Sequence, residues 1–334
     1  MAAIVANSLD AVTHDLIVPL LEDEVTNKGD AGFAAFKSMG GIVEHKGADD
    51  VTAPIVVQET PAGEWYTGAK TFTVNTFDDI GKAVYGWSFY GYPWRIVHTT
   101  YSLNQDSPQK VISILTSSYE QAKRRTQDTL LTRFFGASTA AADLQGLKDA
   151  VAAANPGFGG NFGDRDRVAD TKWQATRITA ASPGNWLTAA GKVVPQKTAL
   201  QRQLRILAKN QSTGSGLGPN LVLMESNVYD KFRARYDDFV AVPNLNTTMQ
   251  DWTSFKINER AWAYPSEYID SGFIYLINLD HIKLYVHPTL YFKDAGWREL
   301  DKSRDLFNVI HFCGFLWANS CQKLGRVEDL ETSL

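Results

Sequence analysis

Hydrophobic positions recur at three- and four-residue steps through one long stretch of the chain, from Pro108 to about Phe135. Such spacing places apolar side chains on one face of a helix. Ser107 suits the N-cap, Pro108 suits the first helical position and Gly136 suits the exit. The pattern predicts a helix over residues 108–135, roughly 40 Å long at about 1.5 Å per residue, which is more than an ordinary domain needs. Its apolar positions are Val111, Leu115, Tyr119, Ala122, Leu130 and Phe134.

A compact alternation of helix and strand is predicted after residue 190. Residues 197–209 carry leucines on one face at helical spacing, so they are expected to form an amphipathic helix. A short buried strand is expected at 220–224, followed by a helix that Ser226 caps.

The last part of the chain is predicted to be rich in strands. Two strands, 272–277 and 282–286, flank the turn Asn278-Leu279-Asp280. The segment from Phe307 to Ala318 is apolar on both faces, which is typical of a central strand. Together with the helices, these strands predict a mixed α+β class.

The first hundred residues follow neither period for long. Residues 1 to about 45 are interrupted by glycines and predict an extended arm with at most short helices and little core of its own. Two β-rich runs, 51–60 and 71–77, are separated by a segment with a proline and two glycines, so they predict a long hairpin or projecting loop. The run 93–98 is expected to be a strand that returns to the main body.

Composition bounds the class of protein. The 334 residues include 33 Lys and Arg against 37 Asp and Glu, a net charge of -4, so the chain lacks the basic excess of a dedicated nucleic-acid binder, although local basic patches stay possible. We expect no signal peptide, and no run of 18 apolar residues exists to span a bilayer. The two cysteines, Cys313 and Cys321, are expected to be small buried hydrophobes.

Aromatic residues make up 12% of the chain, and several cluster between Trp65 and Tyr101. Core packing accounts for most such residues, but a dense aromatic set on an extended segment also indicates surfaces that become buried on association. An arginine pair on the long helix is either a solvated face or a contact with a neighbour or with DNA. The candidate intersubunit contacts are Trp65, Tyr66, Trp87, Tyr92, Trp94, Arg124 and Arg125.

Motifs for catalysis, cofactors and metals fail at specific positions. The glycine-rich stretch 157–163 has Phe162 where the dinucleotide fingerprint needs its third glycine, and 213–218 lacks the Lys-Ser/Thr ending of a phosphate loop. The six histidines and two cysteines show no zinc spacing. Adjacent aspartates fit solvated or capping roles. We therefore expect no enzyme, no cofactor and no metal site.

The order of parts is informative: an arm, a hairpin, one long helix, a compact α/β region and return strands. This order resembles the tailed-bacteriophage major capsid family with the Hong Kong 97-type fold. Local sequence is similar to that family over most of the chain, in degenerate patterns whose order and spacing count together. The segments that carry the resemblance are Leu144-Gln-Gly-Leu147, Gly159-Gly160 with Arg165, Arg167 and Trp173, and the stretches 219–230, 274–284 and 309–327. The stretch 274–284 resembles the family's paired strands that lead back to the peripheral domain.

The resemblance implies how the chain is divided and what it builds. The implied parts are an N-terminal arm (1–45), an extended loop (46–95), a peripheral domain with a spine helix (96–190, helix 108–135), an axial domain (191–286) and a return to the peripheral domain (287–334). Such subunits form pentamers and hexamers of an icosahedral head. The extended loop would lie over a neighbour, the arm would cross another subunit, and loops near 239–256 would face the capsomer centre.

The same resemblance implies partners and location. It implies packaged double-stranded DNA held by non-specific contact, separate scaffolding, portal and decoration proteins, no membrane, and a virion assembled in the cytoplasm of a bacterial host. Because the arm begins at Met1, scaffolding is expected to be a separate protein or absent. No covalent cross-link between subunits is expected.

Three alternatives stay open on the sequence. An encapsulin-type nanocompartment has the same fold and encloses a protein cargo. A soluble α+β enzyme with an unrecognised site would be a well-ordered monomer. A sugar-binding module that uses surface Trp and Tyr side chains is poorly served by one long helix.

Overall fold

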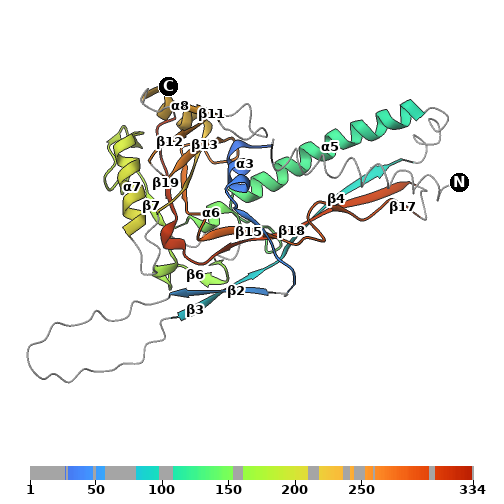
Figure 1. The fold of residues 1–334 in the computed structure, drawn as a ribbon, viewed down its shortest axis with the longest axis horizontal. Coiled ribbons are helices and arrows are strands. Elements are labelled where there is room, and N and C mark those ends of the chain that lie inside the picture. The colour runs from blue at the N-terminus through green and yellow to red at the C-terminus, as the bar shows by residue number, and fades with distance from the viewer. Residues whose placement is uncertain are drawn as a thin grey trace, which may run out of the picture.

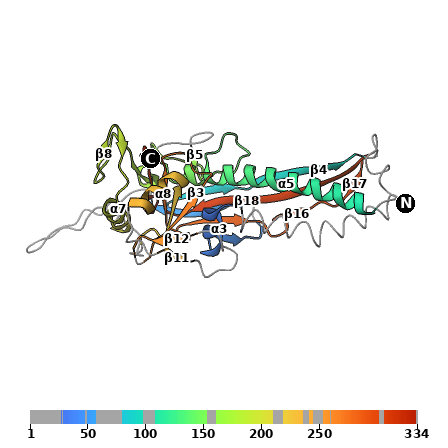
Figure 2. The ribbon, with the colours of Figure 1, turned by 90° about the horizontal axis from the view of Figure 1, so that it is seen from above.

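The structure is a computed structural model, in which a long arm built from one helix and paired strands extends from a broader body (Figure 1). Seen from above, the helix runs alongside the strands of the arm (Figure 2). The residues that the structure describes are 27, 29–47, 50–56, 80–97, 108–152, 161–209, 218–235, 241–243, 253–258, 260–300 and 305–332.

A six-stranded sheet forms the arm and enters the body. Its central strand is β18, which pairs with β4 along one edge and with β15, β16 and β17 in succession along the other. Strand β1 continues the sheet beyond β15, in parallel. The strands are β1 (Ile42–Glu44), β4 (Ser88–Ile96), β15 (Ile282–Val286), β16 (Lys293–Asp294), β17 (Arg298–Glu299) and β18 (Leu306–Ala318).

Strand β18 was predicted to be a central strand with both faces apolar, and it is central. Its first half alternates between buried and half-buried side chains, so one face of the arm stays open. From Phe312 to Leu316 five successive residues are buried, because both faces of the sheet are covered within the body.

A seven-stranded sheet forms the other half of the body, with strand order β11-β12-β13-β10-β14-β19-β7. All five residues of β10 are buried. On one face Val222 and Met224 pack with α7 and α8, and on the other Leu221 and Leu223 join the core beneath the long helix. The elements are β7 (Thr176–Ile178), α7 (Lys197–Lys209), β10 (Leu221–Glu225), α8 (Ser226–Arg235), β11 (Ala241–Pro243), β12 (Thr253–Lys256), β13 (Trp262–Ser266), β14 (Ile274–Ile277) and β19 (Gly325–Val327).

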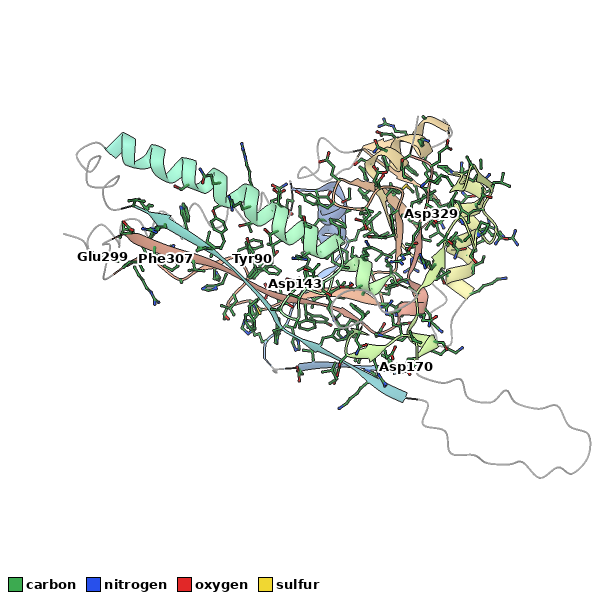
Figure 3. All side chains as sticks on the ribbon, turned by 180° about the vertical axis from the view of Figure 1, so that it is seen from behind. Tyr90, Asp143, Asp170, Glu299, Phe307 and Asp329 are labelled. Atoms are coloured by element: carbon green, nitrogen blue, oxygen red, sulfur yellow. The ribbon has the colours of Figure 1, made fainter. Side chains whose placement is uncertain are left out.

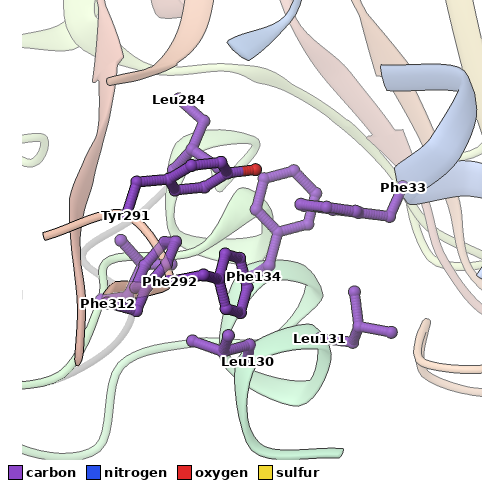
Figure 4. A pocket seen from close by; sticks show the side chains of 9 residues that line it. Phe33, Leu130, Leu131, Phe134, Leu284, Tyr291, Phe292 and Phe312 are labelled. Atoms are coloured by element: carbon purple, nitrogen blue, oxygen red, sulfur yellow. The ribbon is translucent and has the colours of Figure 1, made fainter. Parts of the chain in front are cut away.

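The long helix α5 spans Pro108–Phe135, the bounds that its caps and periodicity predicted. Its last two turns bury Leu130, Leu131, Phe134 and Phe135 against the six-stranded sheet. The packing leaves a cavity of only about 10 Å³, smaller than a bound water requires, between these residues and aromatic side chains of the sheet (Figure 4). The C-terminal end of α5 is therefore packed into the core.

The N-terminal segment 1–45, predicted to be an extended arm with little core of its own, contains a short helix that packs into the core of the body. Helix α3 (Ala31–Ser38) buries Phe33 and Phe36, whose rings meet Phe134 edge to face with centroids 4.8 and 5.0 Å apart. Asp30 caps the helix by accepting a hydrogen bond from the Phe33 amide at 2.9 Å. The glycines shorten the helix, but its two phenylalanines still reach the core.

A hairpin projects from the body where an extended loop was predicted. Strand β2 (Asp50–Val56) pairs with β3 (Ile80–Gly86) in antiparallel register over seven residues (Figure 1). The run 71–77, which the sequence predicted to be the second β-rich run of the hairpin, lies outside the described residues. The observed partner of β2 follows that run in the chain.

Three further predictions are corrected. Strands β14 and β15 do not pair, because each completes a different sheet: β14 lies between β10 and β19, and β15 lies between β1 and β18. Glu225, not Ser226, caps α8, since its carboxylate accepts the amides of Asn227 and Val228, each at 3.1 Å. In the predicted loop 239–256, the described residues form strands β11 and β12, which pair with each other.

Short elements connect these parts. Helix α6 follows the exit of α5, and the small strands and 3-10 turns lie between α6 and α7 or after β18. They are α6 (Leu147–Ala150), β5 (Asn161–Phe162), β6 (Arg165–Asp166), η4 (Thr171–Trp173), β8 (Thr188–Ala189), β9 (Lys192–Val193) and η6 (Cys321–Lys323).

Candidate assembly surfaces

Strand β4 has an inner face that packs beneath α5. Its side chains alternate between buried or half-buried and exposed positions. On the inner face, burial raises the pKa of Tyr92 and the nearby Arg125 of α5 opposes that rise, which places the Tyr92 phenol beside the helix. Tyr90 lies on the same face, between α5 and the strands (Figure 3). Tyr92 is half-buried within its own chain, so it offers a neighbour only part of its side chain.

Trp94 was predicted to be an intersubunit contact, but the structure buries it within its own chain. The residue is 3% exposed, and its ring centroid lies 5.3 Å from that of Trp297. It occupies the same face of β4 as Tyr90 and Tyr92, because side chains two residues apart in a strand point the same way. The period of two therefore places Trp94 in the core of the arm.

The outer face is exposed along β4, whereas on β18 it is half-buried from Phe307 to His311 and buried at Cys313. Phe89, which the sequence did not single out, is 68% exposed. Its partner in the register is Cys313, and the next pairs on this face include Pro93 with Val309 and Arg95 with Phe307 (Figure 3 labels Phe307). The alternation of side chains along β4 indicates that the strand has two different faces, but the sequence alone does not show which of these faces α5 covers. An exposed apolar sheet face of this kind is typical of an interaction surface.

Trp87 lies at the inner end of this face in a cluster of half-exposed rings around the buried Phe315. Its ring centroid lies 4.8 Å from that of Phe315, 5.4 Å from His287 and 6.2 Å from His45. Tyr285 extends the cluster, stacked on Phe315 with centroids 5.4 Å apart. Trp87 is thus partly buried by its own chain, and its remaining surface adjoins the open face.

An open groove of about 340 Å³ lies beside Trp87, between β3 and the segment that follows α5. Its walls include Gly86, Asp143, Gln145 and Asp164. Asp143 accepts hydrogen bonds from the amides of Thr139 and Ala140, which hold the pKa of its carboxyl below the usual range despite partial burial. These carboxylate bonds hold the loop after α5 in place along the groove.

The base of the hairpin is fastened to the body at β3. The amide of Val84 donates to the carbonyl of Gly163 at 2.9 Å, and Arg165 Nε donates to the carbonyl of Lys82 at 2.9 Å. Gly163 has φ +61°, and a Cβ there would lie 2.8 Å from the Tyr85 ring. Only glycine fits this close approach.

Arg167 holds several connections together from a fully buried position. Its Nη2 donates to the carbonyl of Ala150 at 3.0 Å and contacts the sulfur of Cys321 at 3.4 Å. Its guanidinium lies 5.2 Å from the centroid of the Phe162 ring. The sequence indicated Arg167 only as part of a family pattern. Both cysteines are free and buried, as predicted.

The remaining predicted contacts have less structural definition. Arg124 and Arg125 are exposed on α5, so both a solvated face and a contact with a neighbour stay open for them. Trp65 and Tyr66 lie outside the described residues. Among the residues that the structure describes, no group of three or more His, Cys, Asp or Glu could hold a metal ion, and no helix is long and apolar enough to cross a membrane.

Solved structures share this arrangement over nearly the whole chain. The cyanophage A-1(L) capsid matches with a TM-score of 0.60 at 14% identity, covering 90% of this chain and 93% of that one. The chain has the Hong Kong 97-type capsid fold. The capsid of an empty GTA particle shares this fold with a TM-score of 0.55 at 9% identity, over 89% of this chain and 90% of that one.

The same capsid fold also occurs in a compartment-forming protein. The holo-SrpI encapsulin complex from Synechococcus elongatus PCC 7942 matches with a TM-score of 0.52 at 11% identity, over 90% of this chain and 88% of that one. No family model matches the sequence, and no curated protein matches it. The predicted fold and α+β class are therefore confirmed by three-dimensional likeness.

Proposed function

We propose that this chain is the major capsid protein of a tailed bacteriophage, a structural subunit that assembles into pentamers and hexamers of an icosahedral head around double-stranded DNA. The observation that carries the proposal is the capsid fold, shared with the cyanophage A-1(L) capsid over 90% of the chain. A fold alone does not fix a function, so the surfaces of the chain must also suit a shell.

The open face of the arm supports assembly. Phe89 and Phe307 present apolar surface on a sheet whose other face is partly covered by α5. Burying such surface against further copies is favourable, and repeated modest interfaces related by closed symmetry give a stable shell. On this proposal Phe89, Trp87 and the exposed part of Tyr92 contact neighbouring subunits. Arg124 and Arg125 contact a neighbour or the packaged DNA.

The proposal includes a structural role without catalysis. The buried carboxyls with raised pKa have structural partners: Asp30 caps α3, and Asp149 accepts the amides of Ser138 and Gly146. Groups of this kind raise a catalytic hypothesis only when a reacting group faces them. Here the carboxylates accept backbone amides, which supports a role in holding the fold.

The proposed partners follow from the same function. DNA would be enclosed by non-specific contact, since a chain with a net charge of -4 has no overall basic excess. Separate scaffolding, portal and decoration proteins would complete a virion that assembles in the bacterial cytoplasm.

An encapsulin-type compartment is the second candidate, favoured by the match to the SrpI encapsulin. Its TM-score of 0.52 is lower than the 0.60 of the cyanophage capsid, so we place it second. The two functions differ in contents. Particles isolated from the native source would contain nuclease-protected DNA if they are phage heads and a protein cargo if they are compartments.

Light scattering coupled to size-exclusion chromatography tests assembly of the purified chain. The proposal expects species many times heavier than the 37.1 kDa subunit. A single species at the subunit mass, at high concentration and with a scaffolding protein supplied, would overturn it.

A further inference from the structure

Two connections between the sheets meet at one point in the fold. Residues 278–281 lead from β14 in the seven-stranded sheet to β15 in the six-stranded sheet. Residues 319–324 lead back, from β18 through η6 to β19. The amide of Asn319 donates to the carbonyl of His281 at 3.1 Å, so the two crossings are joined directly by their backbones.

The side chain of His281 joins the same two crossings a second time. Its Nδ1 lies 2.8 Å from Oδ1 of Asn319, and its Nε2 lies 2.8 Å from Nζ of Lys323. An ammonium group can only donate, so Nε2 must be the unprotonated nitrogen that accepts from Lys323. The proton of the neutral ring then lies on Nδ1, which donates to the Asn319 amide oxygen. While Lys323 is charged, only the neutral ring with its proton on Nδ1 satisfies both bonds.

Burial favours that neutral state. His281 is 8% exposed and Lys323 is 1% exposed. Desolvation lowers the pKa of the imidazole, as does the Lys323 charge, while the bond to Asn319 and the charge of Asp280 oppose the shift. Asp280 is itself paired with Arg260, whose Nη2 lies 2.6 Å from its carboxylate, and Arg260 also lowers the pKa of His281. Lys323 and Arg260 thus lower the pKa of the ring, and Asp280 raises it.

We propose that His281 is a pH-sensitive latch, which holds the two sheet crossings together while its ring is neutral and releases them when the ring is protonated. A protonated ring would place an N–H against the ammonium of Lys323, with no acceptor between two positive charges. One of the two side chains must then leave, and the crossings lose one of their joining bonds. The latch needs no metal or second chain. If the chain forms a shell, the relation between the sheets that this latch holds would shape each subunit.

Hydrogen exchange at the peptide level, corrected for the intrinsic effect of pH, tests the latch in the full chain. The peptides that cover 278–282 and 319–324 report opening of the two crossings. An imidazole that is freed by opening has an ordinary pKa of 6.5, so it takes up a proton as the pH falls from about 7.5 to about 5. Over that interval we expect the protection of both peptides to fall roughly tenfold. A peptide within residues 306–312 of β18 should keep its protection.

Two variants separate the latch from general acid loosening. His281→Gln keeps an acceptor for Lys323 but cannot titrate, and Lys323→Met removes the ammonium that a charged ring would meet. Each should lose less than about twofold in protection over the same pH interval. His311→Gln, a half-buried histidine on the open face of β18, is the matched control and should behave as the unmodified chain.

The outcomes decide the proposal. Constant protection of both peptides in the unmodified chain across the interval would overturn it. So would an undiminished loss of protection in Lys323→Met, which keeps His281 and therefore remains informative if His281→Gln does not fold.

Discussion

The hydroxyl of Tyr85 donates a hydrogen bond to the carbonyl of Ala318 at 2.7 Å and lies 3.2 Å from the amide nitrogen of the same residue, whose N–H it accepts. Tyr85 belongs to β3 of the projecting hairpin, and Ala318 ends the central strand β18. One phenol thereby satisfies both backbone groups at the end of the strand. The pKa of Tyr85 is raised above its usual value, chiefly by burial, so the phenol stays protonated and can donate.

Tyr85→Phe tests this connection. The change leaves the carbonyl and amide of Ala318 buried without these partners, so we expect the free energy of unfolding to fall by about 1–3 kcal/mol. Urea denaturation at one assembly state measures the loss. Tyr285→Phe, on the half-exposed cluster beside Trp87, is the control and should cost about 0.5 kcal/mol or less. Equal losses in the two variants would show that the Tyr85 hydroxyl does not secure the strand end.

Gly163→Ala tests the close approach at the base of the hairpin. Alanine there meets both an unfavourable φ of +61° and a Cβ 2.8 Å from the Tyr85 ring. Gly184→Ala is a matched control, because Gly184 has φ +54° and a Cβ added there would meet nothing within 4 Å. We expect both to lose about 1 kcal/mol for the backbone and Gly163→Ala to lose at least about 1 kcal/mol more for the contact. Equal melting temperatures for the two variants would contradict this.

The buried carboxyl of Asp30 should make the free energy of unfolding depend on pH, and one substitution should remove that dependence. Burial raises the pKa of its carboxyl to about 6, from an ordinary value of 3.8. A carboxyl whose pKa is raised on folding contributes stability below its unfolded pKa, and that contribution is lost as the pH rises through the folded pKa. The contribution is about 3 kcal/mol, so stability from this group should fall between about pH 4 and about pH 6.

Asp30→Asn keeps an acceptor for the Phe33 amide and cannot ionise, so it isolates this contribution. The difference in unfolding free energy between Asp30→Asn and the unmodified chain should rise in favour of the variant from about pH 4 to about pH 7. Urea midpoints across that range measure it. A difference that stays flat with pH would show that Asp30 does not hold a raised pKa.

The open face of the arm makes a prediction about assembly. Phe89→Glu places a charge on a side chain that is 68% exposed in the single subunit, so the free energy of unfolding should change by about 0.5 kcal/mol or less. Burial of that charge between subunits is unfavourable, so particle yield should drop at least about tenfold in sedimentation assays. Val168→Glu, at a residue that is 66% exposed away from β4, is the control. Normal particle yield from Phe89→Glu would show that the open face does not form a contact between subunits.

Local signals predicted the long helix, and non-local pairing limited what else could be predicted. The bounds of α5 follow from Ser107, Pro108 and Gly136, which act within one turn of the helix ends. The separation of β14 and β15 into two sheets depends on β10, β19 and β18, which come from distant parts of the chain. A turn between two strands favours a hairpin, so sequence alone could not reveal the crossing.

The candidate site shows the same limit at single residues. Trp94 and Phe89 both lie on β4, five residues apart and on opposite faces, and only the position of α5 decides which is buried. Sequence composition favoured Trp94 as the contact, because tryptophan is enriched at interfaces. Arg167 entered only through the resemblance to a family pattern, and its burial, in which it donates to the carbonyls of Ala150 and Ala152, depends on segments that fold around it.

Electron microscopy of the purified full chain, expressed alone and with a scaffolding protein, tests the central claim most directly. The account predicts closed polyhedral particles, or rings of five and six subunits, whose reconstructed subunit shows β4 and β18 covered by a neighbour at Phe89. A uniform population of single subunits under both conditions would contradict it, and would show that this chain has the capsid fold but does not assemble into a shell.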